Sequence, residues 1–147
     1  MAAITNLLTP NSRKWTVDLG LFILRAGTGL LLLPHGLQKL TAFGEKSSEF
    51  YNFLHLGGPV SMALTIFSEV GCSILLILGF CTRLIIFPLI LTMVVVVFLI
   101  NGHATLGDKE EGLLYLIPFV VIFITGPGRI SMDQLFFRKK QAAKPGL

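Results

Sequence analysis

Four long apolar stretches, separated by short polar connections, constrain the fold of this chain more than any other feature. They cover about residues 17–40, 59–80, 84–100 and 109–125. A helix rises about 1.5 Å per residue, so a stretch of about 20 residues reaches across the hydrocarbon core of a bilayer. The sequence therefore predicts an all-α integral membrane protein, built as an antiparallel bundle of four transmembrane helices.

The composition of the 147-residue chain agrees with this interpretation. Hydrophobic residues make up 53% of the sequence and charged residues only 14%, and the mean hydropathy is +0.78. Soluble domains carry about 25% charged residues, so a soluble globular protein is excluded. We expect one membrane domain over residues 1–147, with no room for a separate soluble catalytic domain.

Three glycines in the first apolar stretch predict close packing against neighbouring helices. Gly20 and Gly27 fall on one face, two turns apart, and Gly29 narrows the opposite side. Small residues of this kind let membrane helices approach one another.

A short amphipathic segment is expected between the first two apolar stretches. A serine at position 47 or 48 can cap it, and the Gly57-Gly58 pair can end it. Between these limits Phe50, Phe53 and Leu54 have the i, i+3, i+4 spacing of one helix face. The segment is too short to span a bilayer, so we predict an interfacial helix on the membrane surface.

Lysine and arginine residues are distributed unevenly between the two sides of the predicted bundle. Eight fall on the side of the two termini and three on the other. By the positive-inside rule, both termini are cytoplasmic, and so is the basic tail at 129–147. The net charge of +4 is thus mainly a topology signal, and we expect no nucleic-acid binding. The eight are Arg13, Lys14, Arg83, Arg129, Arg138, Lys139, Lys140 and Lys144, and the three are Lys39, Lys46 and Lys109.

Arg25 stands inside the first apolar stretch, where a charged side chain is costly. An arginine at the centre of a membrane helix costs about 2.5–3.5 kcal/mol on insertion. Glu69 is an acid at comparable depth in the second stretch, and helical rise places both side chains about 15 Å below the outer boundary. We therefore predict an ion pair between Arg25 and Glu69. It is either structural, setting the register of two helices, or the base of a pocket for a head group, quinone or proton.

Polar side chains collect at the outer ends of the predicted spans. If they converge there, they form the mouth of a pocket that can hydrogen-bond a quinone carbonyl or relay protons. The alternative is that they are ordinary interfacial polar residues. The candidates are His35, Gln38, Lys39, His55, His103 and Glu111.

The sequence assigns no catalytic residue and no metal site. It contains no HxxxH or ExxH spacing and no CxxC motif. Cys72 and Cys81 belong to one predicted helix, about 13–14 Å apart along its axis, which is too far for a disulfide. We therefore expect no metal and no covalently bound cofactor.

Taken in order along the chain, these residues resemble the DoxX family of small bacterial membrane proteins. The resemblance extends from about residue 18 to residue 136. It makes Arg83, in the predicted cytoplasmic turn, a further site candidate. The matching features are Arg25, Gly29, the run His35-Gly36-Leu37-Gln38-Lys39, Glu69, the run Leu78-Gly79-Phe80-Cys81-Thr82-Arg83, His103, and the run from Gly126 to Asp133.

This resemblance implies a multi-pass protein of the bacterial inner membrane that is linked to redox processes. The family name comes from a subunit associated with a terminal quinol oxidase and with thiosulfate:quinone oxidation, and other members look like membrane anchors for redox partners. We therefore expect a subunit or accessory protein of a redox system, with quinone as candidate ligand and a soluble or membrane-bound redox protein as candidate partner.

Two classes of function remain open at this point. If the protein is an enzyme, it is a quinone-linked oxidoreductase subunit whose electrons come from a partner or pass directly between substrate and quinone. The alternative is a non-enzymatic membrane scaffold or a small-solute carrier. Self-association into a homo-oligomer in the lipid bilayer is compatible with either class.

Overall fold

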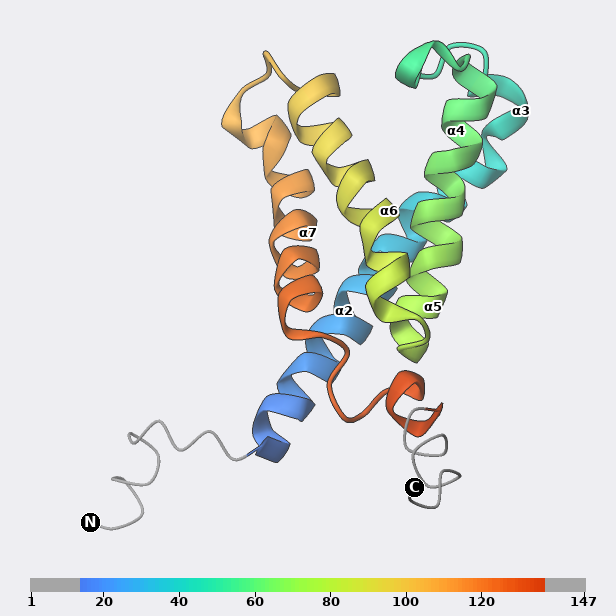
Figure 1. The fold of residues 1–147 in the computed structure, drawn as a ribbon. Helices are drawn as coiled ribbons and strands as arrows, with labels where there is room; N and C mark the ends of the chain where they lie inside the picture. Colours follow the sequence, from blue (N-terminus) through green and yellow to red (C-terminus); the bar gives the residue numbers. More distant parts are fainter. Residues whose placement is uncertain (1–13, 137–147) are drawn as a thin grey trace.

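The computed structural model describes residues 14–136, which are predominantly helical (Figure 1). Four helical rods follow one another along the chain. Their bounds differ from the predicted apolar stretches by only a few residues. The rods are α2 (Lys14–Thr41); α4 (Gly58–Ile66), η2 (Phe67–Cys72) and α5 (Ser73–Leu78) joined end to end; α6 (Thr82–Val94) continued by η3 (Val95–Ile100); and α7 (Leu106–Thr125).

The rods alternate in direction between two ends of the molecule (Figure 1). The terminal end carries Lys14, the α5–α6 turn and the short helical stretch at 132–136. The loop end carries α3 (Phe43–Lys46) and the connection from η3 to α7. The predicted basic residues at 13 and 137–147 lie outside the described residues.

Within residues 14–136, three helical rods are long and apolar enough to cross a membrane. They are Trp15–Thr41, Gly58–Leu78 and Thr82–Ile100. The fourth, α7, has 20 residues but begins with a charged turn that contains Asp108, Lys109, Glu110 and Glu111. Many large apolar side chains on the rods are exposed, as expected for helices that face lipid.

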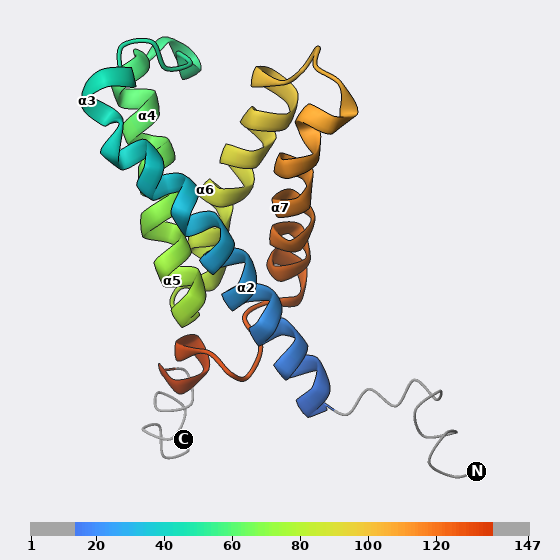
Figure 2. The same cartoon turned by 180° about the vertical axis from the view of Figure 1, so that it is seen from behind.

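The core forms where α2, α5, α6 and α7 meet. Figure 2 shows α2 crossing the other rods diagonally; it packs chiefly on α5 and η2, while α6 packs on α7. Nine buried side chains from all four rods form one apolar cluster. Its members are Leu32, Cys72, Leu76, Ile85, Ile86, Leu89, Met93, Phe119 and Ile122.

Glycines set the distance between α2 and the second rod, but not the pair that the sequence suggested. A Cβ atom at Gly20 or Gly27 would meet nothing within 4 Å. A Cβ atom at Gly29 would lie 2.7 Å from Ile77, and one at Gly36 would lie 2.8 Å from the Cβ of Glu69. Gly29 and Gly36, two turns apart, therefore form the close contact with the second rod.

The connection between α2 and α4 differs from the predicted interfacial helix. Only α3 (Phe43–Lys46) and the single 3₁₀ turn η1 (Phe53–His55) are helical there. Leu54 and His55 have φ values of 53° and 59°, which end a right-handed helix. Tertiary hydrogen bonds hold this path, since the Phe53 amide donates to the Ser61 hydroxyl at 3.0 Å. These contacts outweigh the local helical pattern.

Candidate functional site

Lys39 and Glu69 form an ion pair at the loop end of the molecule. The Lys39 ammonium nitrogen lies 2.5 and 2.6 Å from the two carboxylate oxygens of Glu69. The Glu69 side chain is 2% exposed and that of Lys39 is 30% exposed. A carboxylate buried in a membrane helix needs such a partner, and intramembrane charges commonly mark functional sites.

Two local features bring Glu69 to this position. The absence of a side chain at Gly36 lets the backbone of η2 approach α2, one turn before Lys39. Glu69 itself lies in the π-helical segment η2, and a second π-helical segment, η3, belongs to the third rod. A π-turn adds a residue to a helical turn and is frequent at functional sites. Neither π-segment was expected from the sequence.

A polar cavity of about 120 Å³ opens beside this ion pair. Side chains from α2, η2, η3 and α7 line it, so all four rods contribute. Its charged residues are one cation, Lys39, and three acids, Glu69, Asp108 and Glu111. The other lining residues are Leu32, His35, Met93, Val96, Asn101, Gly112 and Tyr115.

His35 connects the cavity to the outside through Glu111. Its Nε2 atom lies 3.2 Å from a carboxylate oxygen of Glu111, and both side chains are well exposed. The ring of Tyr115 contacts His35 edge to face, with 6.0 Å between ring centroids. His35 and Glu111 thus form an exposed polar pair on the wall of the cavity.

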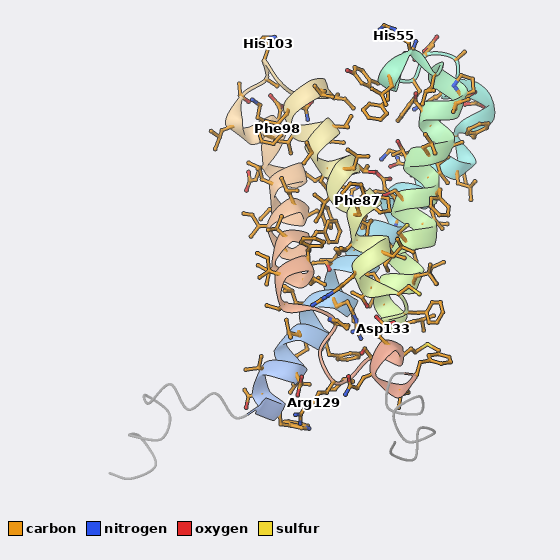
Figure 3. All side chains as sticks on the ribbon, in the orientation of Figure 1. His55, Phe87, Phe98, His103, Arg129 and Asp133 are labelled. Carbon is orange, nitrogen blue, oxygen red and sulfur yellow. The ribbon has the colours of Figure 1, made fainter. Side chains whose placement is uncertain are left out.

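The structure gathers only some of the predicted mouth residues. His35, Lys39 and Glu111 line the cavity together with Glu69, but Gln38 does not line it and is exposed. His55 and His103 project from two separate connections at the loop end, and neither lines the cavity (Figure 3). Convergence of all six predicted mouth residues is therefore wrong, because helix packing selects the side chains on inward faces.

The predicted ion pair between Arg25 and Glu69 is also wrong. Glu69 packs against Gly36, whereas Arg25 packs against Gly79 at the other end of the second rod. The two levels on α2 are eleven residues apart, or about 16 Å by helical rise. The prediction placed both side chains about 15 Å below one outer boundary, but the two rods pack in another register, in which Gly36 rather than Arg25 lies level with Glu69.

Arg25 instead binds the backbone that follows α7. Its guanidinium group donates hydrogen bonds to the carbonyl oxygens of Pro127 at 2.6 Å and Ile130 at 2.7 Å. The Arg25 side chain is 1% exposed, and its guanidinium carbon lies 5.8 Å from the centroid of the Phe22 ring. Arg25 thus satisfies carbonyl groups that no helix satisfies, and its role in the fold is structural.

Asp133 completes this attachment at the terminal end, where Figure 3 labels it. Its carboxylate accepts hydrogen bonds from the amides of Cys81 at 2.7 Å and Thr82 at 2.9 Å, which begin α6. The Asp133 amide in turn donates to the Gly79 carbonyl at 2.9 Å. Arg83, the remaining candidate, is exposed beside this turn and does not line the polar cavity.

Three polar residues of the cavity were absent from the sequence-based candidates. Tyr115, Asn101 and Asp108 come from α7 and the connection before it. Asp108 lies three residues before Glu111 and Tyr115 four residues after it, so all three side chains share one helix face. This spacing could have identified Asp108 and Tyr115 as candidates. Within residues 14–136, His, Cys, Asp and Glu side chains form no group of three that could hold a metal ion.

Comparison with known proteins places the chain in a family. CatD of Bacillus subtilis (strain 168), a protein provisionally named an oxidoreductase, is 23% identical over 125 residues, which cover 84% of this chain and 92% of CatD. No solved structure matches the chain. The sequence model of the DoxX family matches residues 20–102, a range that includes Arg25, His35, Lys39 and Glu69. The chain therefore belongs to the DoxX family.

Proposed function

We propose that this protein is a component of a membrane redox system and that its polar cavity binds the ring of a quinone. The observation that supports this most is the Lys39–Glu69 ion pair, which lies between an apolar interior and a polar cavity. The similarity to CatD, an oxidoreductase by its provisional name, points to the same class of function. In this proposal all four rods cross the bacterial inner membrane and both termini are cytoplasmic.

The residues of the cavity have the chemistry that a quinone ring requires. The Lys39 ammonium has three N–H donors, of which two are directed at Glu69, so the third can donate to a ring oxygen. Tyr115 can donate a second hydrogen bond from its hydroxyl group. Glu69 holds Lys39 in place, and His35 with Glu111 can pass a proton between the cavity and the aqueous side.

The electrons come from, or go to, a partner redox protein in this proposal. This chain would bind and orient the quinone, and a soluble or membrane-bound oxidoreductase would carry out the electron transfer. A homo-oligomer would provide several such sites in one assembly. The alternative functions, a scaffold or a small-solute carrier, require no quinone binding.

Quinone binding to the purified protein tests this proposal. Wild type, Glu69→Gln, Tyr115→Phe and Glu110→Gln are each titrated with ubiquinone and with menaquinone, and thermal unfolding is measured in parallel. Glu110 is the matched control because it is exposed next to Glu111 but does not line the cavity. Tyr115→Phe removes one hydroxyl group and keeps the ring, so it leaves the packing intact.

We expect saturable binding of at least one quinone to wild type and to Glu110→Gln. Glu69→Gln releases Lys39 from its fixed position and so weakens the charged hydrogen bond from Lys39 to the ring, which is worth about 1.5–3 kcal/mol; binding therefore falls about tenfold to a hundredfold. Tyr115→Phe weakens it about threefold to tenfold. No saturable binding to wild type would overturn the proposal. Unchanged binding in both cavity variants would exclude this cavity as the site.

A further inference from the structure

A second, apolar hollow adjoins the polar cavity. It has a volume of about 440 Å³ and lies between the rod of α4 and η2 on one side and the rod of α6 and η3 on the other. Several of its lining side chains are exposed, among them Leu64, Phe67 and Leu91. Figure 1 shows α4 and η3 diverging toward the loop end. The hollow is therefore a groove that opens sideways, toward lipid if the rods cross a membrane.

The groove and the cavity share part of their walls. Lys39 and Val96 line both. Within the described residues, Lys39 is the one charged side chain that lines the groove, and the rest of its wall is mainly aliphatic and aromatic. A single molecule could therefore place a polar head in the cavity and an apolar chain in the groove, with Lys39 at the junction.

The charged side chains of the polar cavity limit which ligand head groups can bind there. Three acids and one lysine line the cavity, so an anionic head such as a phosphate or carboxylate would be repelled. A cationic head would have to lie beside the Lys39 ammonium. A neutral head that accepts hydrogen bonds fits both conditions.

We propose that the groove holds the long hydrocarbon chain of a neutral, membrane-dissolved ligand, which enters the site sideways from the bilayer. This inference rests on the proposed function, which identifies the head as a quinone ring. The chain leaves lipid rather than water, so its van der Waals contacts with the side chains of the groove would supply the extra affinity. The protein would then select long-chain quinones over the same ring without a chain.

The connection between α3 and α4 forms one wall of the groove. Phe50, Tyr51 and Phe53 line it from this connection, and hydrogen bonds tie the connection to α4. The Gly57 amide donates to the Asn52 side chain at 2.7 Å, and the Ser61 hydroxyl donates to the Gly57 carbonyl at 2.8 Å. The irregular path of this connection thus directs three aromatic side chains toward the proposed chain.

Binding measurements with two ligands of different chain length test this inference. The protein is placed in phosphatidylcholine nanodiscs and titrated with long-chain menaquinone and with menadione, the same ring without the chain. Affinities are compared at equal mole fraction in the membrane, so that partitioning does not mimic selectivity. The variant Leu91→Trp fills the groove. Leu99→Trp is the matched control, because Leu99 is exposed on the same rod but does not line the groove.

We expect wild type and Leu99→Trp to bind menaquinone at least tenfold more tightly than menadione. Leu91→Trp should lose this preference while its affinity for menadione stays unchanged. Equal affinities in wild type, or an unchanged preference in Leu91→Trp, would overturn the inference and leave the proposed function intact. Displacement of menaquinone by phosphatidylglycerol would overturn the argument for a neutral head. If neither quinone binds, the proposed function itself fails.

Discussion

Gly36 and Glu69 touch across the contact between α2 and the second rod, where a Cβ atom at Gly36 would lie 2.8 Å from the Cβ of Glu69. This contact lies one turn from Lys39, so the spacing of the two helices and the Lys39–Glu69 ion pair depend on the same glycine.

Gly36→Ala should destabilise the protein, because the added methyl group meets backbone and Cβ atoms that cannot turn away. Overpacking of this kind costs about 1–3 kcal/mol. Gly27→Ala on the same helix is the control, since a Cβ atom there meets nothing within 4 Å. Alanine at position 27 should be neutral or stabilising by about 0.5–1 kcal/mol. Unfolding in detergent measures both, and equal effects would refute the close contact.

Substituting Lys39 alone should destabilise the protein more than substituting Lys39 and Glu69 together. Lys39→Met leaves the Glu69 carboxylate buried without its cation, at a cost of up to about 3 kcal/mol. The double variant Lys39→Met with Glu69→Leu should recover most of this stability, because no buried charge remains. A double-mutant cycle on the free energy of unfolding measures the coupling. Additive effects of the two substitutions on the free energy of unfolding would mean that the ion pair contributes nothing to stability.

Arg25→Met should detach the segment after α7 and leave the polar cavity unaffected. It removes two charge-assisted hydrogen bonds, to Pro127 and Ile130, each worth about 1.5–3 kcal/mol. Hydrogen exchange should therefore accelerate at the Asp133 amide, which bonds the Gly79 carbonyl.

Two comparisons make the Arg25 experiment specific. Arg129→Met should have little effect on exchange, because the Arg129 side chain is 65% exposed and lies 3.8 Å from Asp18. Quinone binding should be the same in wild type and Arg25→Met, since Arg25 lies about 16 Å from the level of Glu69 along α2. If Arg25→Met keeps its fold but loses quinone binding, Arg25 contributes to the binding site after all.

Asp133→Ala should weaken the start of α6. The Asp133 carboxylate accepts from the first two amides at this helix end, and loss of such a cap costs about 0.5–2 kcal/mol. Asp133→Asn keeps one acceptor and should lose less. Thermal unfolding of the two variants checks this order, and a larger loss for the asparagine variant would contradict the capping role.

Cysteine labelling should locate the connections relative to the membrane. In the proposed topology, His55→Cys and His103→Cys, each in a Cys81→Ser background, react with a membrane-impermeant maleimide in intact cells. The native Cys81, which is exposed in the turn before α6, reacts only after permeabilisation. Labelling of Cys81 in intact cells would reverse the orientation. Labelling of His103→Cys only after permeabilisation would contradict the four-span count.

The sequence alone was sufficient for the all-helical architecture and for the approximate bounds of the four rods. Length and hydropathy determine these features, because a backbone in lipid must satisfy its own hydrogen bonds within helices. The family resemblance was also readable from motif order. The sequence predicted His35, Lys39 and Glu111 at the mouth of a pocket with Glu69 at its base. These four side chains line the polar cavity, whereas Arg25, Gln38 and His103 do not.

Only the tertiary structure decided which charges meet. Arg25 and Glu69 appeared to lie at equal depth when depth was counted from presumed helix ends. The actual register depends on where Gly29 and Gly36 contact the second rod, and that contact pairs Glu69 with Lys39. Arg25 found its partners in carbonyl groups more than a hundred residues away, at Pro127 and Ile130. Every residue has a backbone carbonyl group, so no pattern of residue types could have identified these two as the partners of Arg25.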